Sequence, residues 1–224
     1  MQKFIVGINV RTGSTIYALW LNAARPDIAP DEVAAQISWS SNNETPDWSF
    51  PIQHTHQFEV FATAPPEFKR IWCRRNYLDS VLSHFVADHT NTYHLHNYNG
   101  SAEYQEKYQN TKFVIDLFDF HRELKDCNSR DRAVSQWQQQ THNDMIPLLY
   151  HVHAQNTQAF YNAVNLPTPE FIPDWPRPMS VNKYDLVENL SELLEVYQVY
   201  WHNYSDFDVD KDATVARISQ YLRK

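Results

Sequence analysis

The N-terminal stretch of the chain combines an apolar run, a short polar turn and a second apolar stretch. Residues 4–10 are followed directly by Arg11-Thr-Gly-Ser-Thr15, and residues 16–21 resume the apolar pattern. Such a run, broken by a Gly/Ser/Thr turn, predicts a strand, a tight loop and a helix. Backbone N–H groups at a helix N-terminus lack intrahelical partners and carry partial positive charge. The turn therefore predicts an anion-binding loop.

The turn differs from the nucleotide-binding P-loop, G-x-x-x-x-G-K-[ST]. Five residues separate Gly7 from Gly13, whereas the P-loop has four at this place. Ser14 follows the second glycine in place of Lys, and the cation, Arg11, precedes the turn. A cation ahead of the glycine suits a phosphosulfate handled without metal, while a Lys inside the loop suits a metal-bridged triphosphate. An ordinary strand-to-helix turn is the alternative interpretation.

A second segment with the same organisation occupies residues 68–87. Ile71-Trp-Cys73 predicts a short strand, and the apolar spacing of residues 81–86 predicts a helix. Ser83 lies four residues beyond Asp79, one helical turn on, so its hydroxyl and the Arg75 guanidinium can converge on one anion. A capped helix beside solvated arginines is the alternative.

The two segments together resemble the sulfotransferase family that uses 3′-phosphoadenosine 5′-phosphosulfate (PAPS). Arg11-Thr-Gly-Ser-Thr15 is similar to the family's first motif, [KR]-[ST]-G-[ST]-T, and residues 75–83 fit its second motif, R-N-x-x-D-x-x-x-S. The resemblance implies that Arg75 and Ser83 bind the 3′-phosphate. It also implies that the loop binds the 5′-phosphosulfate through Arg11, Thr12, Gly13, Ser14 and Thr15.

Between the motifs, Thr55-His56 matches part of a Lys-Thr-His segment of cytosolic family members, with His54 in place of the Lys. The resemblance implies that His56 takes the acceptor proton and that Arg11 stabilises charge in the transition state. Other branches of the family use a Glu after the first helix, which makes Glu32 or Glu44 the rival base. A strand histidine with a structural hydrogen bond is a further alternative.

Three more residues are expected to contact ligands. Tyr184-Asp-Leu186 resembles, with one residue fewer, the family's Tyr-Glu-Asp-Leu strand end, whose Tyr lies near the adenine. His54 and His84 are expected to contact the acceptor, a small molecule or a glycan. The family's late Arg-Lys-Gly loop over the 3′-phosphate is not visible in the sequence.

Charge and cysteine content exclude several classes of protein. A net charge of −8 argues against nucleic acid as the partner. Two cysteines in 224 residues are too few for a disulfide framework, which favours a cytoplasmic protein, and no signal peptide or membrane span is expected. Three His-x-His pairs occur without a cysteine pair or H-E-x-x-H, so no metal is expected.

We therefore expect a single sulfotransferase-like domain over residues 1–224. Its fold is α/β, with a central, mainly parallel sheet flanked by helices in a P-loop-NTPase-like sulfotransferase fold. The expected reaction moves a sulfuryl group from PAPS to a hydroxyl or amine, with PAP (adenosine 3′,5′-bisphosphate) as product. A non-catalytic nucleotide- or sulfo-ligand-binding protein and a P-loop kinase are the alternatives.

Elsewhere the sequence predicts less specific elements. It predicts an exposed loop at residues 38–49, a strand within residues 50–64 and a lid loop at residues 95–110. Residues 129–150 predict a long helix interrupted at Pro147, and residues 210–222 a last amphipathic helix.

Overall fold

The computed structural model describes residues 2–9, 11, 14–28, 37–40, 46–90, 111–172, 182–204 and 206–223. The chain divides into two compact units. Unit 1 comprises Met1–Arg75 and Ser129–Pro173, and unit 2 comprises Asn76–Asn128 and Asp174–Lys224. The expectation of one domain over residues 1–224 stays a prediction.

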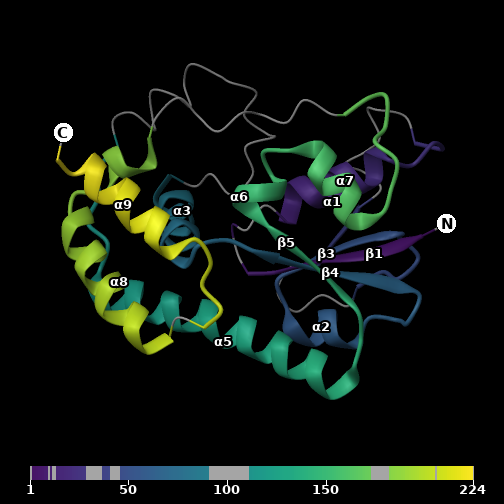
Figure 1. Ribbon diagram of the computed structural model, residues 1–224, viewed down its shortest axis with the longest axis horizontal. Coiled ribbons are helices and arrows are strands. Elements are labelled where there is room, and N and C mark those ends of the chain that lie inside the picture. The colour runs from purple at the N-terminus through teal and green to yellow at the C-terminus, as the bar shows by residue number, and fades with distance from the viewer. Residues whose placement is uncertain are drawn as a thin grey trace. The chain divides into compact units, whose positions relative to one another are not determined.

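Unit 1 is built on an all-parallel sheet, which has five strands in the described part of the chain (Figure 1). The central strand is β1, where Phe4, Ile5 and Val6 are at most 2% exposed. A run buried on both faces is typical of a central parallel strand. The predicted parallel sheet is thereby confirmed. The strands, in the spatial order β2-β3-β1-β4-β5, are β1 (Lys3–Ile8), β2 (Ile37–Ser40), β3 (Ile52–Thr55), β4 (Phe68–Arg74) and β5 (Met145–Leu149).

Helices cover both faces of this sheet (Figure 1). On one face α1 packs against α7, and the rings of Tyr17 and Phe160 stack with centroids 5.3 Å apart. On the other face α2 meets the C-terminal part of α5 through Phe61 and Trp137, whose centroids are 6.1 Å apart. The helices involved are α1 (Ser14–Ala23), α2 (Phe58–Thr63), α5 (Leu117–Thr141), α6 (Tyr150–His153) and α7 (Thr157–Val164).

Gly7 marks a close approach of two strands. A Cβ atom at this position would lie 2.0 Å from the carbonyl oxygen of Thr55 in the neighbouring strand β3. Only glycine lacks that atom, so the sequence can bring β1 and β3 this close only with glycine here. The next residues, Ile8 and Asn9, carry β1 to its carboxyl end.

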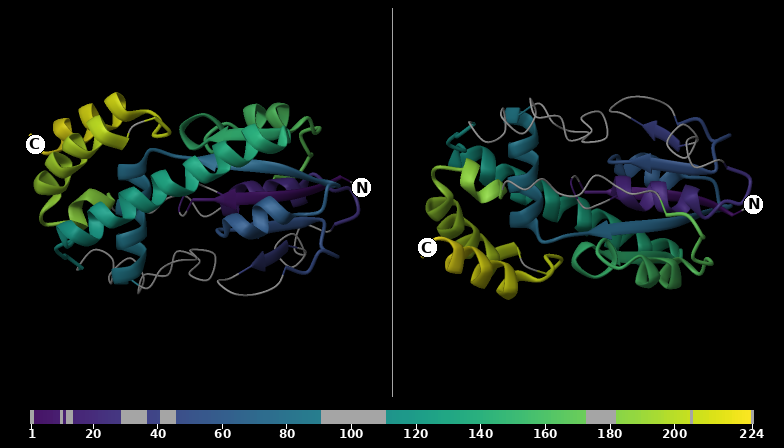
Figure 2. Two further views of the ribbon diagram at one scale, coloured as in Figure 1. Left: turned by 90° about the horizontal axis from the view of Figure 1, so that it is seen from below. Right: turned by 90° about the horizontal axis from the view of Figure 1, so that it is seen from above.

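Unit 2 is mostly helical in its described part. Its core contains five fully buried side chains, those of Leu78, Leu82, Leu124, Leu193 and Tyr197. The helix expected near the C-terminus is confirmed as α9. Helix α5 is continuous through the division, beginning in unit 2 and ending in unit 1 (Figure 2). The remaining elements are α3 (Tyr77–Thr90), the 3₁₀ helix η3 (Lys183–Leu186), α8 (Leu190–Tyr204) and α9 (Lys211–Tyr221).

The expected long helix over residues 129–150 is wrong in its second half. Helix α5 ends at Thr141, and His142 takes a left-handed backbone with φ 52°, a conformation that ends many helices. Residues 145–149 then form strand β5, which includes Pro147. Proline is tolerated there because β5 is an edge of the sheet as described.

Two expectations for residues 38–64 are also corrected. Residues 38–40 belong to β2 rather than to a loop, with Ile37 buried. The strand expected within residues 50–64 ends at Thr55, and α2 follows it. Buried Val60, Phe61 and Ala64 follow helical rather than alternating spacing. The lid expected at residues 95–110 lies outside the described residues.

The two cysteines occupy different units. Cys73 lies in β4 of unit 1 and Cys127 in α5 of unit 2, and both are 0% exposed thiols outside any disulfide. Burial raises the pKa of the Cys73 thiol well above its usual value. Both side chains therefore act as core residues.

Candidate anion-binding site

The carboxyl end of β1 is held by a buried carboxylate. Asn9 Nδ2 donates to Asp131 Oδ1 over 2.7 Å, and Trp72 Nε1 donates to the same oxygen over 2.9 Å. Asp131 lies on α5 and is 1% exposed. Hydrogen bonds to a charged acceptor are stronger than neutral ones. Asp131 therefore fixes the point at which the chain leaves the sheet towards the predicted loop.

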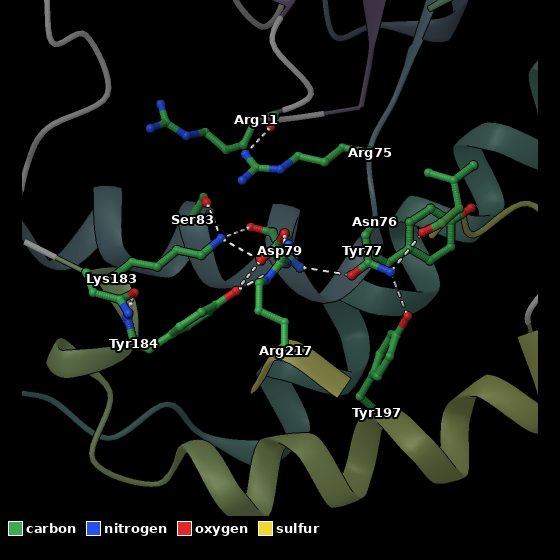
Figure 3. Close-up of polar contacts among 12 residues, drawn as sticks. Arg11, Arg75, Asn76, Tyr77, Asp79, Ser83, Lys183, Tyr184, Tyr197 and Arg217 are labelled. Carbon is green, nitrogen blue, oxygen red and sulfur yellow. Dashed lines mark hydrogen bonds and ion pairs between the residues drawn. The ribbon is translucent and has the colours of Figure 1, made fainter. Parts of the chain in front are cut away.

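Arg11 and Arg75 are brought together in unit 1. Arg11 has a left-handed backbone, with φ 58°, which is uncommon for a residue other than glycine. Its carbonyl oxygen accepts a hydrogen bond from Arg75 Nη1 over 3.0 Å (Figure 3). The Arg75 guanidinium carbon also lies 4.1 Å from the centroid of the Tyr150 ring, within the range of a cation–π contact.

Arg75 retains unused hydrogen-bonding capacity. Its Nε atom is buried and has no hydrogen-bond partner among the residues that the structure describes. Buried donors are normally paired, so an orphaned one calls for an explanation such as an absent ion or ligand. Arg75 thus combines a fixed side chain with a donor that could serve an anion.

Ser14 and His54 form a direct pair beside this loop. Ser14 is the first residue of α1, and its Oγ lies 2.8 Å from Nε2 of His54, which lies on β3. The two residues are 3% and 6% exposed. The His54 ring also contacts two other rings: its centroid lies 5.0 Å from that of Trp39 and 4.8 Å from that of His56. The hydroxyl and imidazoles therefore gather at the carboxyl end of β3.

In unit 2, Asp79 is the centre of a charged cluster (Figure 3). Lys183 Nζ lies 2.9 Å from Asp79 Oδ1 and donates to the Asp79 carbonyl over 2.9 Å and to Ser83 Oγ over 3.0 Å. Arg217 Nη2 lies 2.5 Å from Asp79 Oδ2. Two cations thus surround one carboxylate next to Ser83.

Tyr184 completes this cluster. Its hydroxyl donates to Asp79 Oδ1 over 2.7 Å. Burial, followed by the charge of Asp79, raises the pKa of Tyr184 above its usual value. The phenol stays protonated and keeps its donor role at neutral pH. Tyr184 lies in η3 and not at the end of a strand as expected.

A second polar network holds the start of α3. Asn76 Nδ2 donates to Tyr197 Oη, Asp208 Oδ1 and the Val209 carbonyl, at 2.9, 3.2 and 2.9 Å. Asp208 accepts from the Tyr77 backbone and from Tyr197 Oη, at 2.9 and 2.6 Å. Burial raises the pKa of Asp208 to about 6, although these two hydrogen bonds oppose the shift. A carboxylate of this chain therefore occupies the α3 N-terminus.

The remaining predicted site residues are only partly described. Thr15 is half-buried in the first turn of α1. His84 Nε2 on α3 lies 3.8 Å from Asp88 Oδ2. Ser83 belongs to unit 2 and Arg75 to unit 1, so their convergence on one anion stays a prediction. The residues Thr12, Gly13, Glu32 and Glu44 lie outside the described part of the chain.

Sequence reasoning missed several residues of these arrangements, among them Lys183 and Asp131. Lys183 stands directly before Tyr184, and that adjacency is the signal that could have found it. Asp131 lies among several charged residues of α5, and nothing in the local pattern marks it as the buried one. Only the tertiary contacts of Asn9 and Trp72 identify it.

No family model, curated protein or solved structure matches this chain. Among the described residues, no three His, Cys, Asp or Glu side chains are grouped so that they could hold a metal ion. In the same part of the chain, no helix has the length and apolar character needed to cross a membrane.

Proposed function

We propose that the protein is a sulfotransferase that moves a sulfuryl group from PAPS to a hydroxyl or amine acceptor. The observation that carries the proposal is the position of the Arg11-Thr-Gly-Ser-Thr15 motif. It joins the carboxyl end of the central strand β1 to α1, and Ser14 at the start of α1 contacts His54 of β3, the strand adjacent to β1 in the sheet. Strand, loop and helix N-terminus are the parts that an anion site of this kind requires.

The strand order supports a ligand site at this loop. The helix after β1 lies on one face of the sheet, and the helix after the neighbouring β3 lies on the other (Figure 1). In open parallel sheets, ligands bind outside the carboxyl ends of strands where connections diverge in this way. The loop therefore has the favoured position for a ligand, whichever anion it binds.

The residues present fit a phosphosulfate. Ser14 and Thr15 supply hydroxyls at the N-terminus of α1. Arg75, which the resemblance assigns to the 3′-phosphate, has a buried Nε donor with no partner in the described chain. PAPS supplies an activated sulfuryl group on its phosphosulfate bond. Arg11 would stabilise the negative charge that develops as this bond breaks. Arg75 would orient the loop through the Arg11 carbonyl.

Proton removal from the acceptor is assigned to His56. It follows β3, is half-buried, and its ring contacts His54. His54 would position Ser14 and line the acceptor pocket. The assignment of His84 to the acceptor comes from the sequence alone. Glu32 or Glu44 remains the rival base. The roles of Ser83 at the 3′-phosphate and Tyr184 near the adenine come from the resemblance.

A thermal-shift panel with PAP, PAPS, ATP and ADP tests the nucleotide. We expect PAP and PAPS to raise the melting temperature without Mg²⁺, and transfer of labelled sulfate from PAPS to acceptors would then test turnover. Stabilisation by PAP with no transfer to any acceptor would favour the non-catalytic binding protein. Stabilisation by ATP with Mg²⁺ but not by PAP would favour a P-loop kinase.

A further inference from the structure

The fold buries the hydroxyl group of Tyr17 without giving it a partner. Tyr17 lies on α1, three positions after Ser14, and its side chain is fully buried. Its Oη atom has no hydrogen-bond partner among the residues that the structure describes. A buried hydroxyl normally makes a hydrogen bond, because leaving it unpaired costs free energy. The Tyr17 hydroxyl can therefore serve a group that binds beside it.

The Tyr17 ring is held in place by its aromatic neighbours. It stacks on the Phe160 ring, with centroids 5.3 Å apart and ring planes at 3° to each other. The Trp20 ring meets it edge-on, with centroids 6.0 Å apart. Because the ring is fixed, the position of the hydroxyl oxygen is fixed as well. A donor held in this way loses little freedom when it meets a ligand.

The Tyr17 hydroxyl lies close to the Arg75 guanidinium within unit 1. Burial raises the pKa of Tyr17 above its usual value, and interactions with Cys73 and Tyr150 add to this shift. The positive charge of Arg75 opposes the shift. Such effects weaken with distance, so these groups are neighbours. Cys73 pairs with Ile8 at the end of β1, which places the hydroxyl near the carboxyl ends of β1 and β4.

Arg75 supplies a second buried donor at this place. Its Nε atom has no partner among the described residues, whereas its Nη1 atom donates to the Arg11 carbonyl (Figure 3). The contact with the Tyr150 ring also holds the guanidinium in place. Two buried donors, one of them on a positive charge, match a negatively charged acceptor. A phosphate or sulfate group is such an acceptor and offers several oxygens.

We propose that Tyr17 and Arg75 donate to the same bound oxyanion, which makes Tyr17 a further ligand-binding residue. The identity of the oxyanion rests on the proposed function, in which the resemblance assigns Arg75 to the 3′-phosphate. Tyr17 would then contribute to the preference for PAP over adenosine 5′-phosphate, because only PAP carries that group.

Tyr17→Phe tests this role, since it removes one oxygen atom and keeps the ring. Without ligand, the hydroxyl has no partner to lose, so the melting temperature should not fall. In calorimetry, PAP binding should weaken by about 10- to 100-fold, the loss of one hydrogen bond to a charged group. Binding of adenosine 5′-phosphate should change by less than about threefold, because it lacks the 3′-phosphate.

Tyr161→Phe is the matched control. Tyr161 lies on α7 and is also fully buried, but its hydroxyl donates to the Trp20 carbonyl over 2.8 Å. The same substitution at this position should therefore lower the melting temperature and leave both nucleotide affinities unchanged. The two variants thus separate the loss of a structural hydrogen bond from the loss of a ligand contact.

A double-mutant cycle tests whether the two donors share one oxyanion. Combining Tyr17→Phe with Arg75→Ala should change the free energy of PAP binding by less than the sum of the separate changes, because each removes part of one site. Strict additivity would contradict a shared oxyanion.

The measurements distinguish failure of this inference from failure of the proposed function. A wild-type protein that does not bind PAP would overturn both. PAP affinity that is unchanged in Tyr17→Phe, or that falls no more than the affinity for adenosine 5′-phosphate, would overturn this inference alone. A loss confined to PAP in Tyr17→Phe, and absent in Tyr161→Phe, would support it.

Discussion

Ser14 Oγ and His54 Nε2 lie 2.8 Å apart, and both side chains are buried. The pair joins the first residue of α1 to β3, so the hydroxyl expected to bind the phosphosulfate is oriented by an imidazole. His56, two residues on, contacts the His54 ring and is half-buried. The two histidines should therefore differ in what their removal changes.

His56→Ala should lower kcat by about 10²–10⁴ and leave PAP affinity nearly unchanged, because a general base acts in the transition state. The pH profile of kcat should also lose its acidic limb. His54→Ala should lower kcat less and weaken PAP binding, since Ser14 loses its partner. Steady-state kinetics and calorimetry on both variants check this split. Full activity in His56→Ala, with Glu32→Gln or Glu44→Gln inactive, would assign the base to a carboxylate.

Arg11→Ala should lower kcat by about 10²–10³, because a cation that stabilises the transition state is removed. Arg11→Lys should retain part of the activity, since it keeps the charge. Initial rates at saturating PAPS measure the effect, and wild-type turnover by Arg11→Ala would exclude the proposed role.

Arg75→Ala should weaken PAP binding by about 10- to 100-fold. The affinity for adenosine 5′-phosphate should fall by a smaller factor. It should still fall, because Arg75 also donates to the Arg11 carbonyl. Calorimetry with both nucleotides gives the ratio. Equal losses for the two ligands would show that Arg75 acts on the loop alone and does not bind the 3′-phosphate.

Asp208 should make stability fall as the pH rises. Its pKa is raised from 3.8 in the unfolded chain to about 6 in the folded protein. The native state therefore favours the protonated form, and this stabilisation is complete below about pH 4 and lost as the pH passes about 6. A shift of about two units corresponds to at most ~3 kcal/mol.

Urea unfolding of wild type and Asp208→Asn between pH 4 and 7 measures this pH-dependent contribution to the free energy of unfolding. The variant mimics the uncharged acid, whose stability does not depend on this ionisation. As the pH rises, the free energy of unfolding of the wild type should therefore fall relative to that of the variant. Asp212→Asn on the exposed surface of α9 is the matched control. A difference that stays constant with pH would contradict the assignment.

Gly7→Ala should destabilise the protein by ~3 kcal/mol or more, because the new methyl group would collide with the Thr55 backbone. Neither strand can move without disturbing its other neighbour in the sheet. Thermal or urea unfolding measures the loss, and Lys69→Ala on the exposed side of β4 should change stability by less than ~0.5 kcal/mol. A melting temperature unchanged in Gly7→Ala would show that the strands separate easily.

The elements that the sequence predicted well are those determined by local pattern. The apolar run of β1, the turn and the periodicity of α1 lie within one segment, so no distant contact was needed to predict them. Strand β5 was missed because Pro147 and the apolar spacing around it also suit a helix that ends. Its pairing with β4, from residues far away in sequence, decides the outcome.

The candidate site likewise contains residues that local motifs predict and residues that only tertiary contacts reveal. Arg11, Ser14 and Arg75 could be selected from motifs, and the structure adds how Ser14 and Arg75 are held. Asp131 could not be ranked above the other charged residues of α5, since its importance lies in a contact with Asn9 across a long stretch of sequence. Lys183 is marked in the sequence only by its place before Tyr184, and its contact with Ser83 is also a distant one.

The placement of the cysteines gives the protein two built-in reporters of opening. The chain has no other thiol, and each unit contains one that a modifying reagent can reach only when the surrounding core separates. Labelling rates at Cys73 and Cys127, read by mass spectrometry, would therefore give the opening free energy of each unit separately. Equal rates at the two sites would mean that the units open in one cooperative event, and unequal rates that they open independently.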